Sequence, residues 1–560
     1  MLERYVDRTE FDSYEDFYEN FSVKIPENFN FAYDVIDILA AEKPNEQALV
    51  WCDERGAEAT YTYADIKHFS DQAAEVLVGA GIKKGDPVML VLKRRAEYWW
   101  ILLALHKIGA IGIPATHLLT TKDYVYRCEA ATVVGIVCVD EPGVIKNIED
   151  ACEKLGEKAP RFLAFTRSVH RPPEEPFAGK PWFDFNKARE QAPGAWKRPQ
   201  SVNTNDDTML LYFTSGTTGG PKMVQHNFVY PLGHIVTAKY WQQVEEGGLH
   251  LTVADTGWAK TAWGKIYGQW ICGSAVFVYD YDRFVPKQML EVITKHKVTT
   301  FCAPPTIYRF FIKENLRSYD FSSIKHCVVA GEPLNPEIFE QFFAGTGRKL
   351  RECYGQTELT PTLCTFPWLT PKPGSMGRPT PGYDIDLVRP DGTFCTKGEE
   401  GQLVVRTDKK QPVGLFGGYY RDPDLTASVW HDGLYHTGDV AWCDEDGYYW
   451  FVGRADDVIK SSGYRIGPFE VESVLMEHPA VLECAITGAP DPIRGVVVKA
   501  TIVLAKGYVA SDDLASELQN HVKKTTAPYK YPRIVEFVTE LPKTISGKIR
   551  RVEIRGDEEK

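Results

Sequence analysis

The chain has 560 residues, of which 44% are hydrophobic and 25% are charged, and its formal net charge is -12. This length allows more than one buried core, and the composition excludes an intrinsically disordered protein. The acidic balance argues against a general nucleic-acid binder. The longest apolar stretch, residues 101–115, is interrupted by His106, Lys107 and Pro114. It is too short to span a bilayer, so we expect no membrane insertion.

The N-terminal residues suggest where the protein resides. Residues 1–7 are acidic and lack both the apolar core of a signal peptide and the basic character of a transit peptide. On this ground we expect a cytoplasmic protein. The 12 cysteines show neither a Cys-x-x-Cys pair nor the spacing of a zinc site, so we expect reduced core thiols.

Helical and strand-like patterns alternate from residue 61 onward. We expect helices at 63–77, at 98–107 and near 124, and strands at 88–92, 111–114 and 133–139. Such alternation predicts a doubly wound parallel sheet. A polar, proline-containing stretch at 168–205 is interpreted as a surface excursion without an assigned function.

The next feature is a loop rich in glycine and hydroxyl side chains. It follows an apolar run at 209–213, expected to be a buried strand, and precedes an expected helix from 226 to 239. Glycines let the backbone form a nest of N–H groups, and hydroxyls and an ammonium add donors. We interpret the loop as a phosphate-binding loop rather than a flexible turn. Its residues are Thr214, Ser215, Gly216, Thr217, Thr218, Gly219, Gly220, Pro221 and Lys222.

This loop differs from the phosphate loop of common ATPases. Pro221 precedes the lysine, and Met223 follows it, where that motif requires a magnesium-binding hydroxyl. A phosphate-splitting ATPase of that kind is therefore disfavoured.

A second alternating segment, 208–354, has expected strands at 249–253, 275–279, 298–302 and 325–330. The turns that follow three of them, 254–258, 303–305 and 331–333, are ordinary turns when taken singly. In such sheets, however, ligands bind at the carboxyl ends of strands, so together the turns predict one crevice. Residues 351–358 add an aromatic ring for a purine, a hydroxyl for a phosphate and a carboxylate for magnesium.

The last third of the chain changes character. Residues 373–451 show short strands and turns that predict a small β subdomain. Within it, Asp439 follows a glycine and suits a ribose as well as it suits a solvated turn. Residues 453–467 resemble a linker, and the patterns from 470 to 538 predict a compact α+β unit. Lys548, after Ser546 and Gly547, would by itself be interpreted as a surface turn.

Taken in order from residue 214 to residue 548, these motifs resemble those of the adenylate-forming enzymes, which include acyl-CoA synthetases, firefly-type luciferases and peptide-synthetase adenylation domains. The segments 255–258, 461–468 and 527–533 are most similar to medium-chain acyl-CoA synthetases. The resemblance implies a large N-terminal domain, 1–455, made of two doubly wound α/β subdomains plus the small β subdomain. It also implies a small, mobile α+β C-terminal domain, 456–560.

The resemblance implies that the protein is a ligase of fatty-acid metabolism. It also implies Mg²⁺ as the cofactor and ATP and coenzyme A as co-substrates. A carboxylic acid attacks ATP to give an acyl-adenylate and pyrophosphate, and coenzyme A then displaces AMP. Gly355 stands where acetyl-specific relatives have tryptophan, so medium straight-chain, branched short-chain and aromatic acids stay open. Two rival functions are the loading of a carrier protein and nucleotide-dependent regulation without catalysis. A homo-oligomer is left open.

The resemblance also implies residue roles. Lys548, Thr357 and Glu358 are expected to be catalytic, Thr217 and Glu358 to bind metal, and Asp456 to be the hinge. Besides loop 214–222 and Lys548, the expected ATP contacts are Gly331, Glu332, Pro333, Glu352, Cys353, Tyr354, Gly355, Gln356, Asp439 and Arg454. Those to coenzyme A are Ser462, Gly463, Tyr464, Arg494, Lys523, Tyr531, Pro532 and Arg533. Those to the acyl substrate are Trp258, Trp263, Gly264, Gly355, Thr357 and Arg465.

Overall fold

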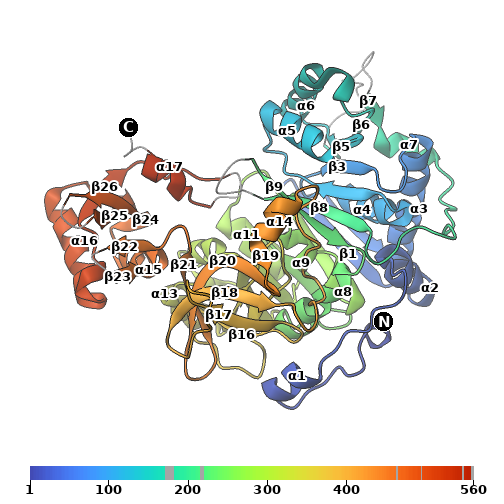
Figure 1. Ribbon diagram of the computed structural model, residues 1–560. Coiled ribbons are helices and arrows are strands. Elements are labelled where there is room, and N and C mark those ends of the chain that lie inside the picture. Colours follow the sequence, from blue (N-terminus) through green and yellow to red (C-terminus); the bar gives the residue numbers. More distant parts are fainter. Residues whose placement is uncertain (171–181, 215–219, 462–463, 493–494, 545–547, 557–560) are drawn as a thin grey trace.

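The computed structural model describes residues 1–170, 182–214, 220–461, 464–492, 495–544 and 548–556 (Figure 1). It is a mixed α/β protein with a large N-terminal domain and a small C-terminal domain, which confirms the predicted fold class. The boundary between residues 455 and 456 stays a prediction.

A seven-stranded sheet in the order β7-β6-β5-β3-β4-β8-β9 forms the first part of the large domain. Its pairs are parallel except β8–β9. The short strand β7 extends the sheet within the stretch expected to be only a surface excursion. The strands are β3 (Pro87–Val91), β4 (Ile111–Pro114), β5 (Gly135–Val139), β6 (Phe162–Thr166), β7 (Trp182–Asp184), β8 (Thr208–Thr214) and β9 (Lys222–Asn227).

Helices cover this first sheet. Helix α3 begins at a capping box in which Thr62 and Asp65 bond each other's backbone N–H, and α4 ends at Gly109, whose φ of 70 suits glycine. All but the first residue of α4 are buried, so this helix is an interior layer. The helices are α3 (Tyr63–Gly79), α4 (Glu97–Ile108), α5 (Thr121–Ala131), α6 (Pro142–Leu155) and α7 (Phe185–Gln191).

The structure corrects the expected helix at 226–239. Residues 222–227 form β9, which pairs with β8 along its length, and the helical segments α8 (Tyr230–Ile235) and η4 (Val236–Trp241) follow. The physical reason is the alternating pattern in which Val224 and His226 are buried, a period that suits a strand. The predicted phosphate loop therefore joins the two strands of a hairpin.

A fourteen-stranded sheet forms the rest of the large domain, in the order β17-β18-β20-β21-β16-β15-β14-β13-β12-β10-β11-β1-β2 with β19 beside β20. Its parallel part is β14, β13, β12, β10, β11 and β1. The parallel strands are β1 (Gln47–Asp53), β10 (Leu249–Thr252), β11 (Ala275–Asp280), β12 (Thr300–Ala303), β13 (His326–Ala330) and β14 (Leu350–Tyr354). Strand β2 (Glu58–Thr62) pairs antiparallel with β1 at the edge of the sheet.

The predicted β subdomain continues this second sheet instead of standing apart. The short strands β15 (Leu363–Cys364) and β16 (Ser375–Pro379) connect β14 to β21 by antiparallel pairing. The bridge places the ends of β14 and β20 close together, as the site below requires. The remaining strands are β17 (Asp384–Val388), β18 (Glu400–Arg406), β19 (Trp430–His431), β20 (Leu434–Cys443) and β21 (Tyr449–Arg454).

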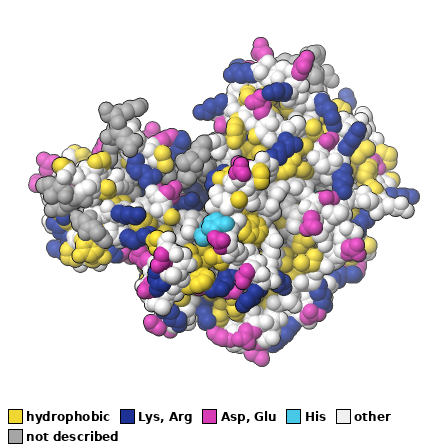
Figure 2. Space-filling view, in the orientation of Figure 1, with side chains coloured by type: hydrophobic (Ala, Val, Ile, Leu, Met, Phe, Trp, Pro, Cys, Tyr) yellow, Lys and Arg dark blue, Asp and Glu magenta, His cyan; other side chains and the backbone are white. Residues whose placement is uncertain are grey.

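The C-terminal domain has its own core, in which Val471, Leu475, Ile486 and Leu518 are buried. It adjoins the large domain through α15, where the Asn335 side-chain amide donates to the Ser473 carbonyl at 3.2 Å. On the face drawn in Figure 2, a hollow separates it from the rest of the molecule. Its elements are β22 (Ile459–Ser461), β23 (Tyr464–Ile466), α15 (Pro468–Glu477), β24 (Val481–Asp491), β25 (Gly495–Leu504), α16 (Asp512–Thr525), β26 (Ile534–Val538) and α17 (Arg551–Gly556).

Candidate functional site

A buried carboxylate, Asp439, is the centre of the candidate site. Tyr354 at the end of β14 donates its hydroxyl to Asp439 Oδ2 at 2.5 Å, and the Gln356 amide donates to the same oxygen at 2.6 Å. Arg454, its partner across the β20–β21 ladder, lies 3.5 Å from Asp439 Oδ1. Burial raises the pKa of Asp439, and the charge of Arg454 opposes that rise. The structure thus brings together four residues that the sequence predicted for the nucleotide.

A second carboxylate, that of Glu358, lies two residues after Gln356 in the segment that follows β14. The Tyr419 hydroxyl donates to Glu358 Oε1 at 2.9 Å, and the Phe416 N–H donates to the Glu358 carbonyl at 2.8 Å. Burial raises the pKa of Glu358, and the Tyr419 hydroxyl and the Lys222 charge lower it. The Lys222 ammonium lies 5.2 Å from the Tyr419 ring centroid, so the phosphate hairpin reaches this carboxylate.

These residues fit a magnesium ion that arrives with ATP. Mg²⁺ usually binds one or two carboxylates plus substrate phosphates instead of a cage made only of protein groups. Glu358 supplies such a carboxylate beside the hairpin. Within the described ranges, no cluster of three or more His, Cys, Asp or Glu side chains offers a cage for a metal ion.

Glu352 accepts hydrogen bonds from the backbone next to the predicted adenine-binding turn. Its two carboxylate oxygens accept from the Leu334 N–H at 3.0 Å and the Gly374 N–H at 2.7 Å. The turn at 331–333 directly precedes Leu334, and Gly331 has a φ of 108 that favours glycine. Glu352 therefore anchors the turn through its backbone. Its expected direct contact with ATP stays a prediction.

We expect Glu352 to give the protein a characteristic pH dependence of stability. Burial raises its pKa to about 8 although two N–H donors favour the charged form, whereas in the unfolded chain it titrates near about 4.3. The folded state binds the extra proton between these values, so stability falls as pH rises through them. Between about pH 5 and about pH 8 the thermal midpoint of Glu352→Gln should decline less steeply than that of the wild type. Parallel slopes would contradict this assignment.

Two tryptophans and two glycines form the predicted acyl region. The ring of Trp263, on α9 (Lys260–Gly264), lies across Gly355, because a Cβ added to Gly355 would be 2.5 Å from its Cη2 atom. A Cβ on Gly264 would be 1.9 Å from Thr252 Oγ1, so only glycine lets α9 approach β10. Trp258 is partly buried and lies two residues before the start of α9. The space that Gly355 leaves is therefore closed on this side by Trp263.

A lysine of α9, Lys260, belongs to the same acyl region. Lys260 donates to the Ala330 carbonyl at 2.5 Å, and its Nζ atom is 3.6 Å from the position of a Cβ on Gly331. Desolvation lowers the pKa of Lys260, and the charge of Lys548 lowers it further. That charge also lowers the pKa of Asp439. The charge of Lys548, on the C-terminal domain, thus acts on both the nucleotide and the acyl regions of the large domain.

The predicted coenzyme A residues gather on the C-terminal domain around one ring. Lys523 Nζ lies 3.9 Å from the Tyr531 ring centroid, and Arg533 donates to the Tyr531 hydroxyl at 2.7 Å. Pro532 between them is buried. Tyr464 is half exposed and stacks on Tyr529 with 4.0 Å between ring centroids.

Two predicted residues, Asp456 and Arg465, lie near the linker between the domains. Asp456 follows β21, where its carboxylate lies 3.6 Å from Arg454 Nε and its carbonyl accepts from Arg555. Arg465 is exposed, and its charge acts on Glu400 of β18 rather than on the acyl region.

Several predicted site residues lie outside the described residues: Ser215, Gly216, Thr217, Thr218, Gly219, Ser462, Gly463 and Arg494. Sequence reasoning missed Tyr419 and Tyr435, whose hydroxyls bond Glu358 and Gln356. An aromatic pair after Gly417 and Gly418 is the only signal that the sequence offers for Tyr419.

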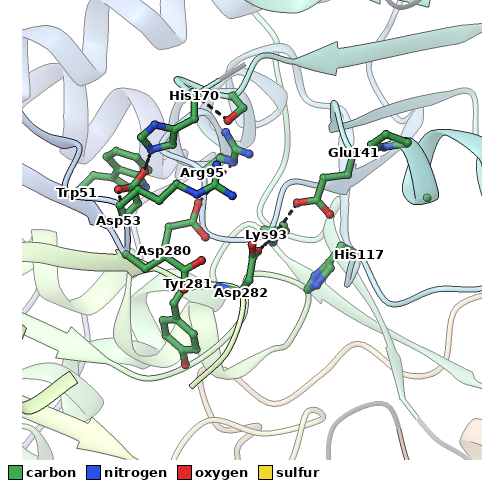
Figure 3. Close-up of a pocket in the computed structure, with 15 residues that line it drawn as sticks. Trp51, Asp53, Lys93, Arg95, His117, Glu141, His170, Asp280, Tyr281 and Asp282 are labelled. Atoms are coloured by element: carbon green, nitrogen blue, oxygen red, sulfur yellow. Dashed lines mark hydrogen bonds and ion pairs between the residues drawn. The ribbon is translucent and has the colours of Figure 1, made fainter. Parts of the chain in front are cut away.

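A cavity of about 430 Å³ lies where the two sheets meet (Figure 3). Lys93 pairs with Glu141 at 2.7 Å and with Asp282, and His170 pairs with Asp53, so ion pairs bridge its walls. Lys93 and Arg95 are already paired with carboxylates, and the predicted phosphate-binding residues do not line the cavity. The nucleotide is therefore better placed at Asp439 and Glu358.

The chain is similar to known proteins along most of its length. A family model described as "AMP-binding enzyme" matches residues 37–420, and one described as "AMP-binding enzyme C-terminal domain" matches residues 470–548. The chain is 40% identical to acyl-coenzyme A synthetase ACSM3, mitochondrial, of Mus musculus, over 98% of this chain and 94% of the relative. It is 41% identical to acyl-coenzyme A synthetase ACSM4, mitochondrial, of Rattus norvegicus, over 95% and 91%.

Solved structures of this fold include an acyl-CoA synthetase of Brucella canis, with 31% identity, a TM-score of 0.74, and coverage of 98% of this chain and 99% of that one. The anthranilate CoA ligase AuaEII, solved with anthranoyl-AMP, is 27% identical with a TM-score of 0.83 and coverage of 95% and 98%.

One expectation is wrong on these comparisons. The two relatives are named as mitochondrial proteins, which contradicts the cytoplasmic location inferred from residues 1–7. The helices in the described ranges include none with the length and apolar character needed to cross a bilayer.

Proposed function

This chain belongs to the AMP-binding enzyme family and is an AMP-forming acyl-CoA synthetase, and from that premise we propose that it works through an acyl-adenylate. One observation carries the proposal. The cluster of Tyr354, Gln356 and Asp439 lies beside Glu358, and the charge of Lys548 reaches it from another domain.

In the proposed first step, an oxygen of the substrate carboxylate attacks the α-phosphorus of ATP. The bond from that phosphorus to the bridging oxygen breaks, and pyrophosphate leaves. Asp439 accepts from the ribose hydroxyls, the loop ending in Lys222 binds the leaving phosphates, and Glu358 would hold a Mg²⁺ ion bound to those phosphates. Bound magnesium neutralises phosphate charge, which lets an anionic acid approach.

Lys548 contributes the positive charge at the reacting atoms. Attack of a carboxylate on a phosphate brings two anions together, so a cation between them stabilises the transition state more than the separated reactants. The interaction of Lys548 with Asp439 supports this role, because the nucleotide would lie between the two domains.

In the proposed second step, the coenzyme A thiol gives its proton to water and its sulfur attacks the acyl carbon. The bond from that carbon to the phosphate oxygen then breaks, which releases AMP. We propose that rotation at Asp456 first withdraws Lys548 and brings Tyr464 to the channel of the thiol. Lys523, Tyr531 and Arg533 then bind the phosphorylated nucleotide of coenzyme A. Their grouping around one ring supports a shared site.

For the acid itself, we propose a compact acyl group, branched or aromatic, over an unbranched medium chain. Trp263 fills the space beside Gly355 that a long chain would need. The anthranilate ligase of the same fold acts on an aromatic acid, which is consistent with this choice.

The Trp263→Ala variant tests this specificity. Removing the indole opens space beside Gly355, so kcat/KM for an unbranched eight-carbon acid should rise relative to that for a branched five-carbon acid by about tenfold or more, since each methylene accommodated contributes ~1–3 kcal/mol. Steady-state kinetics on both acids measure the ratio. Trp196→Phe, a change at a partly buried tryptophan outside the acyl region, serves as the matched control. An unchanged ratio in Trp263→Ala would show that the chain extends elsewhere.

The proposed function is tested by acid-dependent pyrophosphate release, measured with and without coenzyme A on a panel of short, branched, aromatic and medium-chain acids. We expect at least one acid to give stoichiometric AMP, pyrophosphate and acyl-CoA. Pyrophosphate release that never yields acyl-CoA would favour the loading of a carrier protein. No acid-dependent release at all would refute the proposal.

A further inference from the structure

A buried histidine contacts the nucleotide segment from the strand that follows the phosphate loop. His226, on β9, has 1% of its surface exposed, and its Nε2 lies 2.7 Å from the Thr357 carbonyl oxygen. Thr357 directly precedes Glu358. The contact therefore joins β9 to the residues predicted for the α-phosphate and the magnesium ion.

The hydrogen bond fixes the state of the ring. A carbonyl oxygen only accepts, so Nε2 must carry the hydrogen. Burial lowers the pKa of His226 to about 4, which keeps the ring neutral at physiological pH. Nδ1 has no hydrogen-bond partner within the described part of the chain. The imidazole thus acts as a neutral donor aimed at one backbone oxygen.

The strand places this donor in register with the phosphate loop. Lys222, Val224 and His226 alternate along β9, so their side chains share one face. Lys222 at the first position acts on the Glu358 carboxylate, and His226 at the third bonds the preceding carbonyl. One short strand therefore holds both ends of the Thr357–Glu358 peptide relative to the loop.

Packing leaves the ring little freedom to move. Tyr230 stacks on His226 with 3.8 Å between ring centroids and 25° between planes. Tyr230 is itself 1% exposed and lies on α8 directly after the strand. A buried donor that cannot rotate away holds its acceptor more strictly than an exposed one.

We propose that His226 is a positioning residue, which sets the backbone of Thr357 and Glu358 for MgATP while itself touching neither substrate nor metal. The inference rests on the proposed function and deepens it. It predicts that the donor at the Nε2 position matters more than ring shape or charge.

Two matched variants separate these properties. In His226→Gln, the amide can place a donor near the Nε2 position; in His226→Met, the chain is of similar length but has no donor. Calorimetric titration with MgATP measures the Kd, which depends on the geometry of the binding site and does not require catalysis. We expect the Kd for MgATP to rise about tenfold in His226→Met, the size of one lost buried hydrogen bond, and to stay within about twofold of wild type in His226→Gln. The Mg²⁺ concentration for half-maximal pyrophosphate release should rise in parallel, with kcat changed less than KM for MgATP.

The outcomes are distinct from those that test the function. If both variants bind MgATP like the wild type, the positioning role is overturned even if acid-dependent pyrophosphate release stands. If both lose binding equally, the ring is needed for packing and the inference is also overturned. Should His226→Met fail to fold, His226→Asn, whose amide is too short to reach Thr357, makes the same comparison with His226→Gln.

Discussion

Replacing Lys548 with alanine should slow acyl-adenylate formation by about 10²–10³-fold, the usual effect of removing one preorganised electrostatic group from a transition state. Its charge acts on Asp439 and Lys260, although it lies on the C-terminal domain and is exposed to solvent. Pyrophosphate release at saturating acid and MgATP measures the first step.

The second step provides the internal control for Lys548→Ala. We expect that variant to convert supplied acyl-adenylate and coenzyme A to acyl-CoA at close to the wild-type rate, because Lys548 is withdrawn in that step. Lys506→Ala, an exposed lysine after β25, should leave both steps unchanged. Equal loss of both steps in Lys548→Ala would contradict the assigned role.

Replacing Glu358 with glutamine should reduce kcat/KM for MgATP by about a hundredfold or more, because a neutral amide is a weak ligand for Mg²⁺. The shape of the side chain is kept, and the Tyr419 hydroxyl can still donate to the amide oxygen. The expected signature is a higher Mg²⁺ requirement, measured by titrating the metal at fixed ATP.

Two further variants bracket the Glu358→Gln result. Tyr419→Phe removes the hydroxyl that holds Glu358 but keeps the carboxylate, so its effect should be smaller and in the same direction. Glu340→Gln, on the exposed face of α13 (Pro336–Thr346), should have no effect. A Glu358→Gln enzyme with an unchanged Mg²⁺ requirement would show that the metal binds elsewhere.

The sequence predicted the elements whose signal is local. The buried strands of both sheets and the helices of the C-terminal domain match their apolar periodicity, and Tyr354, Gln356, Asp439 and Arg454 were predicted for one site. Their assignment to one site came from the resemblance of the motifs to those of the adenylate-forming enzymes, because Asp439 by itself suited a solvated turn equally well.

The errors share a physical cause, because they depend on contacts between distant segments. The expected helix at 226–239 began too early, inside β9, because the pairing of β9 with β8 joins segments whose contact the local pattern does not reveal. Gly355 predicted an acyl pocket that extends beyond two carbons, and the close approach of the Trp263 ring to Gly355 could not be predicted, because Trp263 comes from another strand connection. His226 and Tyr419 belong to no motif that the sequence reveals. Their hydrogen bonds to Thr357 and Glu358 form only when the folded chain brings these residues together.

The central claim is that one site joins an acid to AMP before coenzyme A enters. The most direct test incubates enzyme with MgATP and an acid in the absence of coenzyme A, and then quantifies enzyme-bound acyl-adenylate by mass spectrometry. The account predicts close to one adenylate per active site, and its conversion to acyl-CoA and AMP within a single turnover after coenzyme A is added. Formation of acyl-CoA at full rate with no adenylate at any time would contradict it.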